Sequence, residues 1–431
     1  MKTFLILPHQ LFAEEYLPEE EYEYILWEHP QYFNKYNYNK KRLVMHRASM
    51  KYYQDYLKKN NHKVTYYEYN KKPKLTEYDM FDPIDKLGLK GDIYESPNFL
   101  LTEDDYNRYR EKTDKFFFHN FYNWSKKELD IIPKIKSQDK LNRNKLPSKK
   151  MDIPDLPPNG DKKYIDEAVR YVNKNFSKNY GTAENFQFPV SHSVSRKWLK
   201  DFVKDKFKLY GDYQDAITDR HDYLYHSCLS TCINIGLLNP SEIIEYIDEK
   251  KKGIPMNSYE GYIRQLFWRE YQRYCYIHYN FNGKNYFGNN KKIGKEYYNG
   301  TTGIVPVDDC IKKAFENGYL HHIERLMVVG NYMNLDGIKP MDGMRWFIEF
   351  SCDSYEWVMH QNVLDMVFCV TGGDTMRKPY ISSSNYVLKM SDYEDGEWSK
   401  EWNKKFKKFT DKNKDKLYKF RYFFPFLFRK S

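Results

Sequence analysis

The chain has 431 residues, and its 70 Lys and Arg outnumber its 60 Asp and Glu, which gives a formal net charge of +10. This length supports two or three domains with sizeable cores and excludes a small disulfide-stabilised module. No apolar run reaches the roughly 18 residues that a membrane-spanning helix needs, so we expect no membrane partner and predict a soluble, intracellular protein that acts as a monomer.

Aromatic residues are unusually frequent, with 42 Tyr and 28 Phe. A positive charge favours an anionic partner, and exposed rings can stack on the bases of a nucleic acid. An excess of Lys, Asn and Tyr also follows from an AT-rich genome, so composition alone leaves nucleic-acid binding open. The six cysteines contain no Cys-x-x-Cys pair, which indicates reduced thiols and no metal site.

The N-terminal third alternates between apolar runs of strand length and one longer helical pattern. This alternation predicts a parallel, Rossmann-like α/β domain over residues 1–130. In such sheets ligands lie beyond the carboxyl ends of the strands, so residues 8–10 and 27–29 are expected at a pocket. No glycine-rich phosphate loop follows a strand, which argues against dinucleotide binding here. The predicted elements are strands at 3–7, 24–28 and 63–67 and a helix at 47–60.

Residues 131–163 are rich in Lys, Pro, Asn and Asp, which predicts a linker. Residues 164–431 show helical periodicity almost throughout, which predicts an all-α domain. Its tail, after Trp398, is basic and aromatic and is expected to be a packed or docking extension. The predicted helices lie at 164–175, 193–206, 241–251, 259–279, 307–317, 320–334 and 343–350.

Polar side chains of several kinds gather between Gly318 and Met390. Within the predicted helix at 320–334, His322, Arg325 and Leu326 share one face, because offsets of three and four residues bring side chains together. A face that is half polar needs partners if it is buried, and these come from the protein or from a large polar ligand. Taken alone, such residues are more often structural polar groups than a site.

Four ordered segments carry a resemblance to a known family. They read His-His-Ile-Glu-Arg-Leu-Met at 321–327, Tyr-Glu-Trp-Val at 355–358, Asn-Val-Leu-Asp-Met at 362–366 and Lys-Pro-Tyr-Ile-Ser-Ser at 378–383. Together they resemble the photolyase/cryptochrome family, closest to its photolyase-related branch of iron-sulfur bacterial cryptochromes/photolyases and prokaryotic (6-4) photolyases. The resemblance implies an antenna-like α/β domain, with an antenna chromophore of unknown identity in some members, and a helical FAD-binding domain.

The resemblance also implies which residues bind FAD. The segment 226–231 occupies the family's phosphate cradle, although a Ser-rich helix start is by itself usually only an N-cap. Arg325 and Asp353 match an ion pair beside the isoalloxazine ring, where a guanidinium stabilises reduced flavin and a carboxylate compensates its burial. The residues placed at the cofactor are His226, Ser227, Leu229, Ser230, Gln265, Arg269, Arg325, Asn331, Asp353 and Asn362.

A second set is placed at a DNA lesion. Trp268, Leu326 and Met366 match positions beside an extruded base, and a ring such as Trp268 can replace the stacking that a flipped base has lost. His322 matches the proton donor for repair of a (6-4) photoproduct, because imidazole can give and regain a proton near neutrality. His321 is expected to orient it or to be protonated with it.

Tyr380 matches a tyrosine at the lesion, and Trp346 stands where this branch begins its electron relay to the flavin. Phe347 replaces an aromatic residue that can be redox-active, so the relay beyond Trp346 stays open. Without the resemblance, Trp268 and Trp346 would be interpreted as core aromatics.

The chain departs from the family at two places. Bacterial members of the branch have cluster cysteines after the Ser-Asp-Tyr motif, but no cysteine follows Cys369 here, and only Cys310 lies near a ligand position. One thiolate cannot hold a cluster that needs four ligands, so no iron-sulfur cluster is expected. Met359 stands where the family often has Asn, Asp or Glu facing flavin N5, which affects the flavin redox state that persists.

The function predicted is that of a blue-light-driven, FAD-dependent DNA photolyase, a lyase that acts on UV-damaged DNA, with the histidine pair favouring (6-4) photoproducts. Three alternatives stay open: a cyclobutane pyrimidine dimer photolyase, a cryptochrome-like blue-light sensor without repair activity, and a flavin-free nucleic-acid-binding relic. The sequence leaves undecided the strand preference, the antenna chromophore, the host and the compartment.

Overall fold

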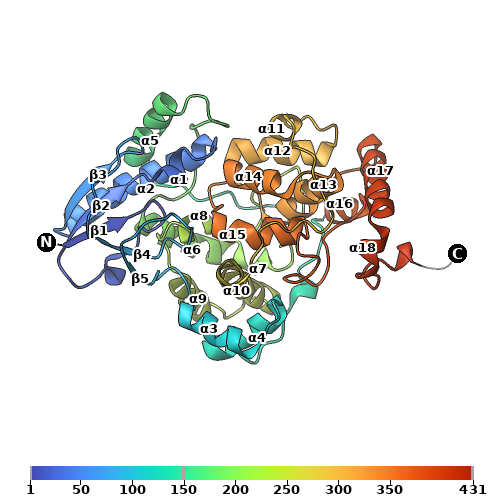
Figure 1. Cartoon of the computed structure of the whole chain (residues 1–431), viewed down its shortest axis with the longest axis horizontal. Coiled ribbons are helices and arrows are strands. Elements are labelled where there is room, and N and C mark those ends of the chain that lie inside the picture. Colours follow the sequence, from blue (N-terminus) through green and yellow to red (C-terminus); the bar gives the residue numbers. More distant parts are fainter. Residues whose placement is uncertain (1, 148–150, 429–431) are drawn as a thin grey trace.

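The computed structural model describes residues 2–147 and 151–428 (Figure 1). In this part of the chain a parallel sheet with the strand order β3-β2-β1-β4-β5 lies at one end, and helices form the remainder. This arrangement confirms the predicted fold class. The strands are β1 (Lys2–Ile6), β2 (Tyr22–Trp27), β3 (Lys63–Tyr67), β4 (Asp79–Phe81) and β5 (Asp92–Tyr94).

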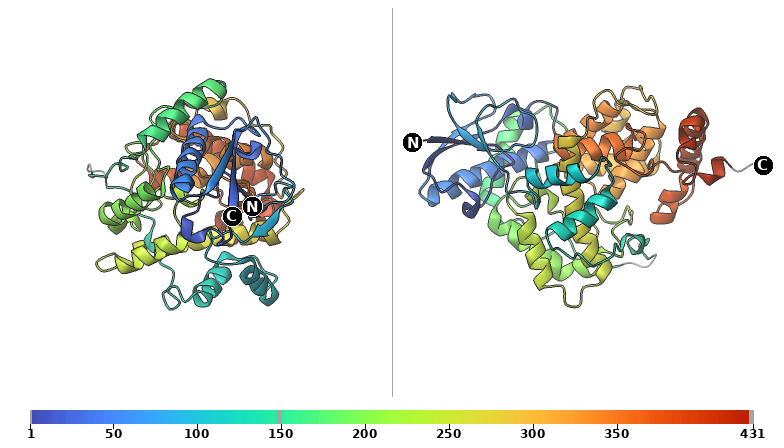
Figure 2. Two further views of the ribbon diagram at one scale, coloured as in Figure 1. Left: turned by 90° about the vertical axis from the view of Figure 1, so that its left-hand side faces the viewer. Right: turned by 60° about the horizontal axis from the view of Figure 1, so that its bottom comes forward.

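The central strands of the sheet are buried on both faces. Phe4, Leu5 and Ile6 of β1 are fully buried, as the continuous apolar run predicts. Helix α2 (Lys40–Lys59) packs beside the sheet, and α5 (Lys162–Asn175) packs on α2 (Figure 2). Helix α2 begins earlier than the periodicity predicted, because the side chain of Asn39 caps it by accepting a hydrogen bond from Lys41 N at 2.9 Å.

The carboxyl edge of the sheet, where a pocket was expected, is filled by the protein's own bonded side chains. Gln10 Nε2 donates to Phe81 O at 2.8 Å. The buried Glu28 carboxylate accepts hydrogen bonds from Arg47, Tyr66 and Tyr171, at 2.9, 2.6 and 2.8 Å. Gln10 therefore ties the segment after β1 to β4, and Glu28 holds the sheet to α2 and α5.

Helix α10 (Met256–His278) runs through the middle of the helical part (Figure 1). Two buried carboxylates on it hold the segment that follows the sheet. Glu270 accepts from the backbone of Leu100 and Leu101 and from Tyr106, and Glu260 accepts from Tyr122 at 2.7 Å. Helices α3 (Glu103–Lys112) and α4 (Phe118–Glu128) are thereby brought against the helical part.

The region around residues 318–390 contains two π-helical turns. The predicted helix at 320–334 is found as η3 (Glu324–Gly330) followed by α13 (Asn331–Leu335), and a second π-helix, η4 (His360–Val367), follows α15 (Glu356–Met359). Such wide turns are rare and frequently occur at functional sites. The two turns contact each other, so they bring 321–327 and 362–366 together.

The other elements of the described chain are helices and short 3₁₀ turns. None of the helices in the described part of the chain is both long and apolar enough to cross a membrane. The other elements are α1 (Pro30–Phe33), α6 (His192–Asp205), α7 (Phe207–Tyr210), α8 (Ser230–Ile233), α9 (Pro240–Glu249), α11 (Glu296–Asn299), α12 (Val305–Asn317), α14 (Pro340–Phe350), α16 (Asn385–Met390), α17 (Glu397–Lys412) and α18 (Lys414–Tyr418), with short 3₁₀ turns η1 (Glu14–Tyr16), η2 (Asp139–Leu141) and η5 (Pro425–Leu427).

Candidate functional site

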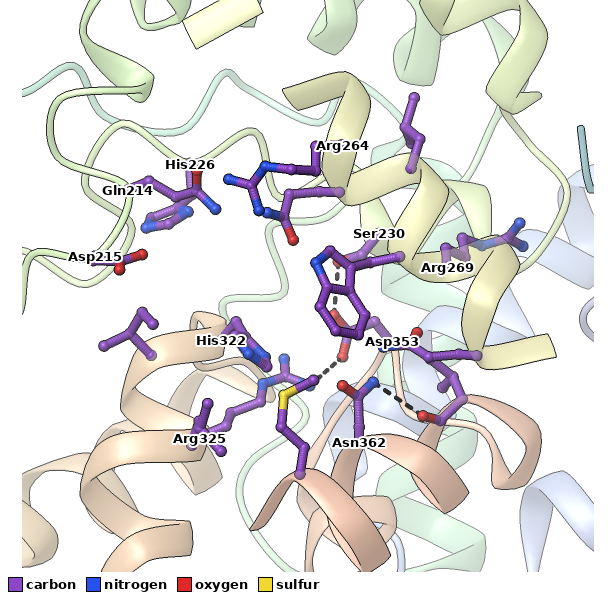
Figure 3. Close-up of a pocket in the computed structure, with 18 of the residues that line it drawn as sticks. Gln214, Asp215, His226, Ser230, Arg264, Arg269, His322, Arg325, Asp353 and Asn362 are labelled. Atoms are coloured by element: carbon purple, nitrogen blue, oxygen red, sulfur yellow. Dashed lines mark hydrogen bonds and ion pairs between the residues drawn. The ribbon is translucent and has the colours of Figure 1, made fainter. Parts of the chain in front are cut away.

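A cavity of about 490 Å³ opens between α10, η3, η4 and the loop that precedes α8 (Figure 3). This volume falls within the range of roughly 300–1,000 Å³ that is usual for small-molecule and cofactor sites. Most of the residues singled out in the sequence line it, although they come from distant segments. Those lining it are His226, Ser227, Ser230, Gln265, Trp268, Arg269, His322, Arg325, Leu326, Asp353, Asn362, Met366 and Tyr380.

Four of the singled-out residues lie behind this lining. Leu229 is fully buried, and Asn331 Nδ2 donates to Ser382 Oγ at 2.9 Å. Trp346 is also fully buried, and its Nε1 donates to Tyr297 O at 2.6 Å. Its ring lies 5.0 Å from that of Phe347, which does line the cavity. The fourth, His321, is described below.

An ion pair stands in the wall of the cavity. Arg325 Nη1 donates to Asp353 Oδ1 at 2.9 Å, and Ser230 Oγ donates to Asp353 Oδ2 at 2.6 Å (Figure 3). Burial alone would raise the pKa of Asp353, but Arg325 and the hydroxyls of Ser230 and Ser351 hold that pKa below its usual value. The wall therefore carries a fixed guanidinium whose charge is balanced from one side.

The helix that follows the expected phosphate-binding segment is very short. Helix α8 has one turn, so the segment offers hydroxyl groups rather than the dipole of a long helix. The hydroxyl of Ser227 lies 3.0 Å from that of Tyr262 on α10. Cys228 takes a positive φ of 54°, which turns the chain sharply between Ser227 and α8.

Several buried polar atoms around the cavity lack a hydrogen-bond partner within the described residues. They are Arg264 Nε and Nη2, Arg269 Nη2, His226 Nε2 and Asn362 Oδ1. Buried polar atoms in native proteins are nearly always paired, so donors and an acceptor that line one cavity indicate a polar ligand there. Apolar lining by Leu326, Val363 and Met366 is suited to an aromatic ring system at the same place.

Comparison with known proteins identifies the family. Residues 4–83 and 74–188 match the family model of deoxyribodipyrimidine photo-lyase-related proteins, and residues 262–421 match the FAD binding domain of DNA photolyase. The chain belongs to the photolyase/cryptochrome family. Its resemblance to the prokaryotic (6-4) branch, found in the sequence, is confirmed by a (6-4) photolyase of Agrobacterium fabrum that is 37% identical over 238 residues.

That match covers 54% of this chain and 47% of the relative, so the chain aligns with about half of the photolyase's length. An uncharacterised mimivirus protein, R853, is 46% identical over 111 residues, which are 25% of this chain and 85% of that protein. The crystal structure of a bacterial class III photolyase from Agrobacterium tumefaciens aligns with a TM-score of 0.56 at 13% identity. It covers 90% of this chain and 86% of that one, which supports the fold.

The histidine pair of this photolyase-family site divides between the cavity and its wall. The His322 ring is exposed into the cavity, and desolvation by the surrounding protein, together with Arg325, lowers its pKa to about 4. His321 is buried, and its ring stacks on that of His226 with 4.8 Å between centroids. The two side chains thus face different surroundings although they are adjacent in sequence.

Behind His321 lies an ion pair that sequence reasoning missed. Glu324 Oε2 is 3.5 Å from His321 Nε2, and its other oxygen accepts from Lys313 of α12. Burial lowers the pKa of His321 far below its usual value. The position of Glu324 three residues after His321 on a helix is the signal that could have revealed the contact.

Charged residues at the mouth of the cavity were also missed. Arg264 of α10 lies 3.1 Å from Asp139, and Asp139 accepts from Arg143 at 2.6 Å. Burial raises the pKa of the neighbouring Asp215 to about 7, against the effect of Arg143. Asp139 and Arg143 fall in the stretch predicted as a linker, whose composition gave no sign that it lies across a photolyase-family pocket.

Trp268 does not stand alone at the cavity. Its ring stacks on that of Phe118 from α4, with 3.7 Å between centroids and 12° between planes. Both rings line the cavity, so Trp268 is held in a fixed orientation from one side. All six cysteines are free and buried, and within residues 2–147 and 151–428 no group of three or more His, Cys, Asp or Glu is arranged to hold a metal ion.

Proposed function

We propose that this chain is a blue-light-driven, FAD-dependent DNA photolyase that repairs pyrimidine lesions, with a preference for (6-4) photoproducts. The observation that carries this proposal is the single cavity shared by the Arg325–Asp353 pair, His322 and Trp268. One cavity then offers groups suited to a flavin and groups suited to a damaged base. The 37% identity to a (6-4) photolyase supports the same activity.

The residues present fit FAD. Ser227 and Ser230 would hold phosphate oxygens through their hydroxyls, and Arg325 would face the isoalloxazine ring with its charge balanced by Asp353. When bound and reduced, FAD would supply the light-driven electron that opens the lesion and would take that electron back after repair. The buried atoms of Arg269 and Asn362 that lack protein partners are candidates to bind the cofactor's polar atoms.

The protein's own side chains bind and orient the lesion. Trp268, held by Phe118, presents a ring on which an extruded base stacks, and Leu326 and Met366 exclude water around it. Tyr380 lines the same space. Excluding water strengthens each electrostatic contact inside the cavity.

His322 is the group that moves a proton. Its ring faces the cavity and is neutral in the free protein at neutral pH, because desolvation and Arg325 lower its pKa to about 4. An anionic lesion brought next to it offsets this effect and favours the imidazolium, which can then donate to the lesion. Cyclobutane dimers need no such proton, so His322 favours the (6-4) assignment.

We propose that the chain carries no iron-sulfur cluster, because Cys310 alone lies near a family ligand position and no cysteine follows Cys369. Trp346 serves as the inner member of an electron relay, through its contact with Phe347. The proposed division is residues 1–130, 131–163 and 164–431, with the protein acting as a monomer on UV-damaged DNA.

The test uses purified, FAD-loaded and reduced protein with two oligonucleotides, one bearing a (6-4) photoproduct and one a cyclobutane dimer. The proposal predicts restoration of the (6-4) lesion under blue light and none in the dark. Restoration of the cyclobutane dimer alone would establish the other photolyase activity. If neither lesion is restored by flavin-loaded protein, a cryptochrome-like sensor becomes the better account.

A further inference from the structure

The C-terminal segment from Glu397 to Phe428 concentrates the positive charge of the chain. It contains ten Lys or Arg and four Asp or Glu, a net charge of +6, whereas the whole chain carries +10. More than half of the net charge therefore lies in this one segment. Helices α17 and α18 stand at the end of the molecule that is opposite to the sheet (Figures 1 and 2).

One side of this segment is fixed to the helical part. Trp402 is fully buried, and its Nε1 donates to Ser382 O at 3.0 Å. Lys405 bonds to Asp336, and Lys419 Nζ donates to Gly372 O at 2.6 Å. Phe420 is buried as well. The segment is therefore a docked part of the fold with a defined outer surface.

The outer side exposes four large aromatic rings. The exposed fractions are 55% for Tyr418, 81% for Tyr422, 45% for Phe423 and 56% for Phe426. Single exposed apolar residues are ordinary, but four rings within nine residues of a strongly basic segment are not. Exposed rings of this kind together with cations are typical of surfaces that bind single-stranded nucleic acid.

Two cations each lie near two aromatic rings. The Arg421 guanidinium lies 4.8 Å from the ring centroid of Tyr418 and 4.7 Å from that of Tyr422. Lys378 Nζ lies 5.6 Å from the ring centroid of Phe423 and 5.5 Å from that of Tyr380. Tyr380 lines the cavity, so Lys378 connects the cavity lining to Phe423 of the tail.

We propose that the tail surface formed by Tyr418, Arg421, Tyr422 and Phe423 binds the unpaired DNA strand that flanks the lesion. Cations attract the phosphates, and rings stack on bases that have lost their partners. Duplex DNA offers phosphates but no free base faces, so the exposed rings favour an unpaired strand. The inference rests on the proposed function, because it takes the lesion to enter the cavity beside Tyr380.

The test measures binding of an undamaged, fluorescently labelled 25-mer of oligo(dT) in the dark, by anisotropy, at several salt concentrations. The Arg421→Ala/Tyr422→Ala variant should bind about tenfold more weakly than the parent, and the slope of log K against log salt should fall by about 0.7. The matched control is Lys163→Ala/Tyr164→Ala on α5, where Lys163 likewise lies over a tyrosine ring, at 4.9 Å. The control should stay within twofold of the parent.

Unchanged oligo(dT) affinity in a folded tail variant would overturn the proposal. The single variant Tyr422→Ala provides a second check, because this ring is largely exposed and its removal should not disturb folding. If the tail variant loses affinity equally for a 25-base-pair duplex, the choice of an unpaired strand is overturned. If the variant loses binding to anionic vesicles without any change in DNA affinity, the surface is assigned to a membrane. Undamaged DNA needs no repair chemistry. Failure here with intact lesion repair is therefore distinct from failure of the photolyase activity itself.

Discussion

Arg325 of η3 and Asp353, which follows α14, are joined through a 2.9 Å hydrogen bond inside the wall of the cavity. The pair links two segments of the cavity wall, and Ser230 attaches the loop before α8 to the same carboxylate. Because both members are largely buried, removing either charge leaves the other without compensation.

Asp353→Asn should therefore lower the free energy of unfolding by about 3–5 kcal/mol and reduce retention of FAD. Urea denaturation and the flavin absorbance of the gel-filtered protein measure the two effects. Asp166→Asn, which breaks the exposed pair with Lys162, is the matched control and should cost less than about 1 kcal/mol. Equal effects of the two substitutions would contradict this account of the wall.

His322→Ala should abolish (6-4) repair, with a loss of at least about 100-fold, because it removes the proposed proton donor. Flavin content should be unchanged, since the side chain faces the lesion side of the cavity in our proposal. Repair is followed by chromatography of the irradiated oligonucleotide, and flavin by absorbance. Repair at the parent rate by the Ala variant would refute the role given to His322.

Glu324 and Lys313 should behave as one unit. Glu324→Gln and Lys313→Met each leave a buried charge without its partner, so each should destabilise the protein by about 3–5 kcal/mol. The double variant removes both charges and should cost less than the sum of the single changes by roughly 0.5–3 kcal/mol. Additive losses in urea denaturation would mean that the two side chains do not depend on each other.

The buried His192 should contribute a loss of stability on mild acidification. Burial lowers the pKa of His192 to about 4, so between pH 6.5 and pH 4 the unfolded chain binds a proton that the native state does not. The contribution of His192 to the free energy of unfolding therefore decreases as pH falls through this window, by on the order of 3 kcal/mol. His29 and His322 have their pKa lowered to about 4 as well and act in the same direction.

His192→Gln should make the dependence of unfolding free energy on pH shallower between pH 6.5 and pH 4. Tyr52→Phe is the control, because it removes the hydroxyl 2.9 Å from His192 Nδ1 but leaves the titrating ring in place. The control should lose stability at all pH values and keep the parent slope. A parent-like slope in His192→Gln would contradict the assignment.

The sequence predicts those parts of the structure that depend on local patterns. Strands β1 to β3 follow from apolar runs, and α10 follows from its periodicity. Strands β4 and β5 were missed because three residues are too few to show alternation, and η3 and η4 were missed because π-helical turns leave no distinct period in a sequence.

The dependence on local patterns also explains which residues of the site could be identified from the sequence. Family motifs that are continuous in sequence located Arg325 and His322, and the match to the family's ion pair located Asp353. Asp139 lies at the cavity mouth because of its contact with Arg264, 125 positions along the chain, and no local feature of the predicted linker specifies that contact. The contact between Glu324 and His321 could have been predicted, because the two residues are three positions apart on a helix. The ion pair of Glu324 with Lys313 could not, because it joins two separate helices.

The most direct test of the central claim is a flavin determination. Purified protein is incubated with FAD, freed of unbound cofactor and denatured, and the released flavin is quantified by absorbance and chromatography. We expect one FAD per chain in the parent protein and reduced retention in Asp353→Asn. A protein that neither arrives with flavin nor retains it after incubation would contradict the assignment of the cavity, and with it the proposed photolyase activity.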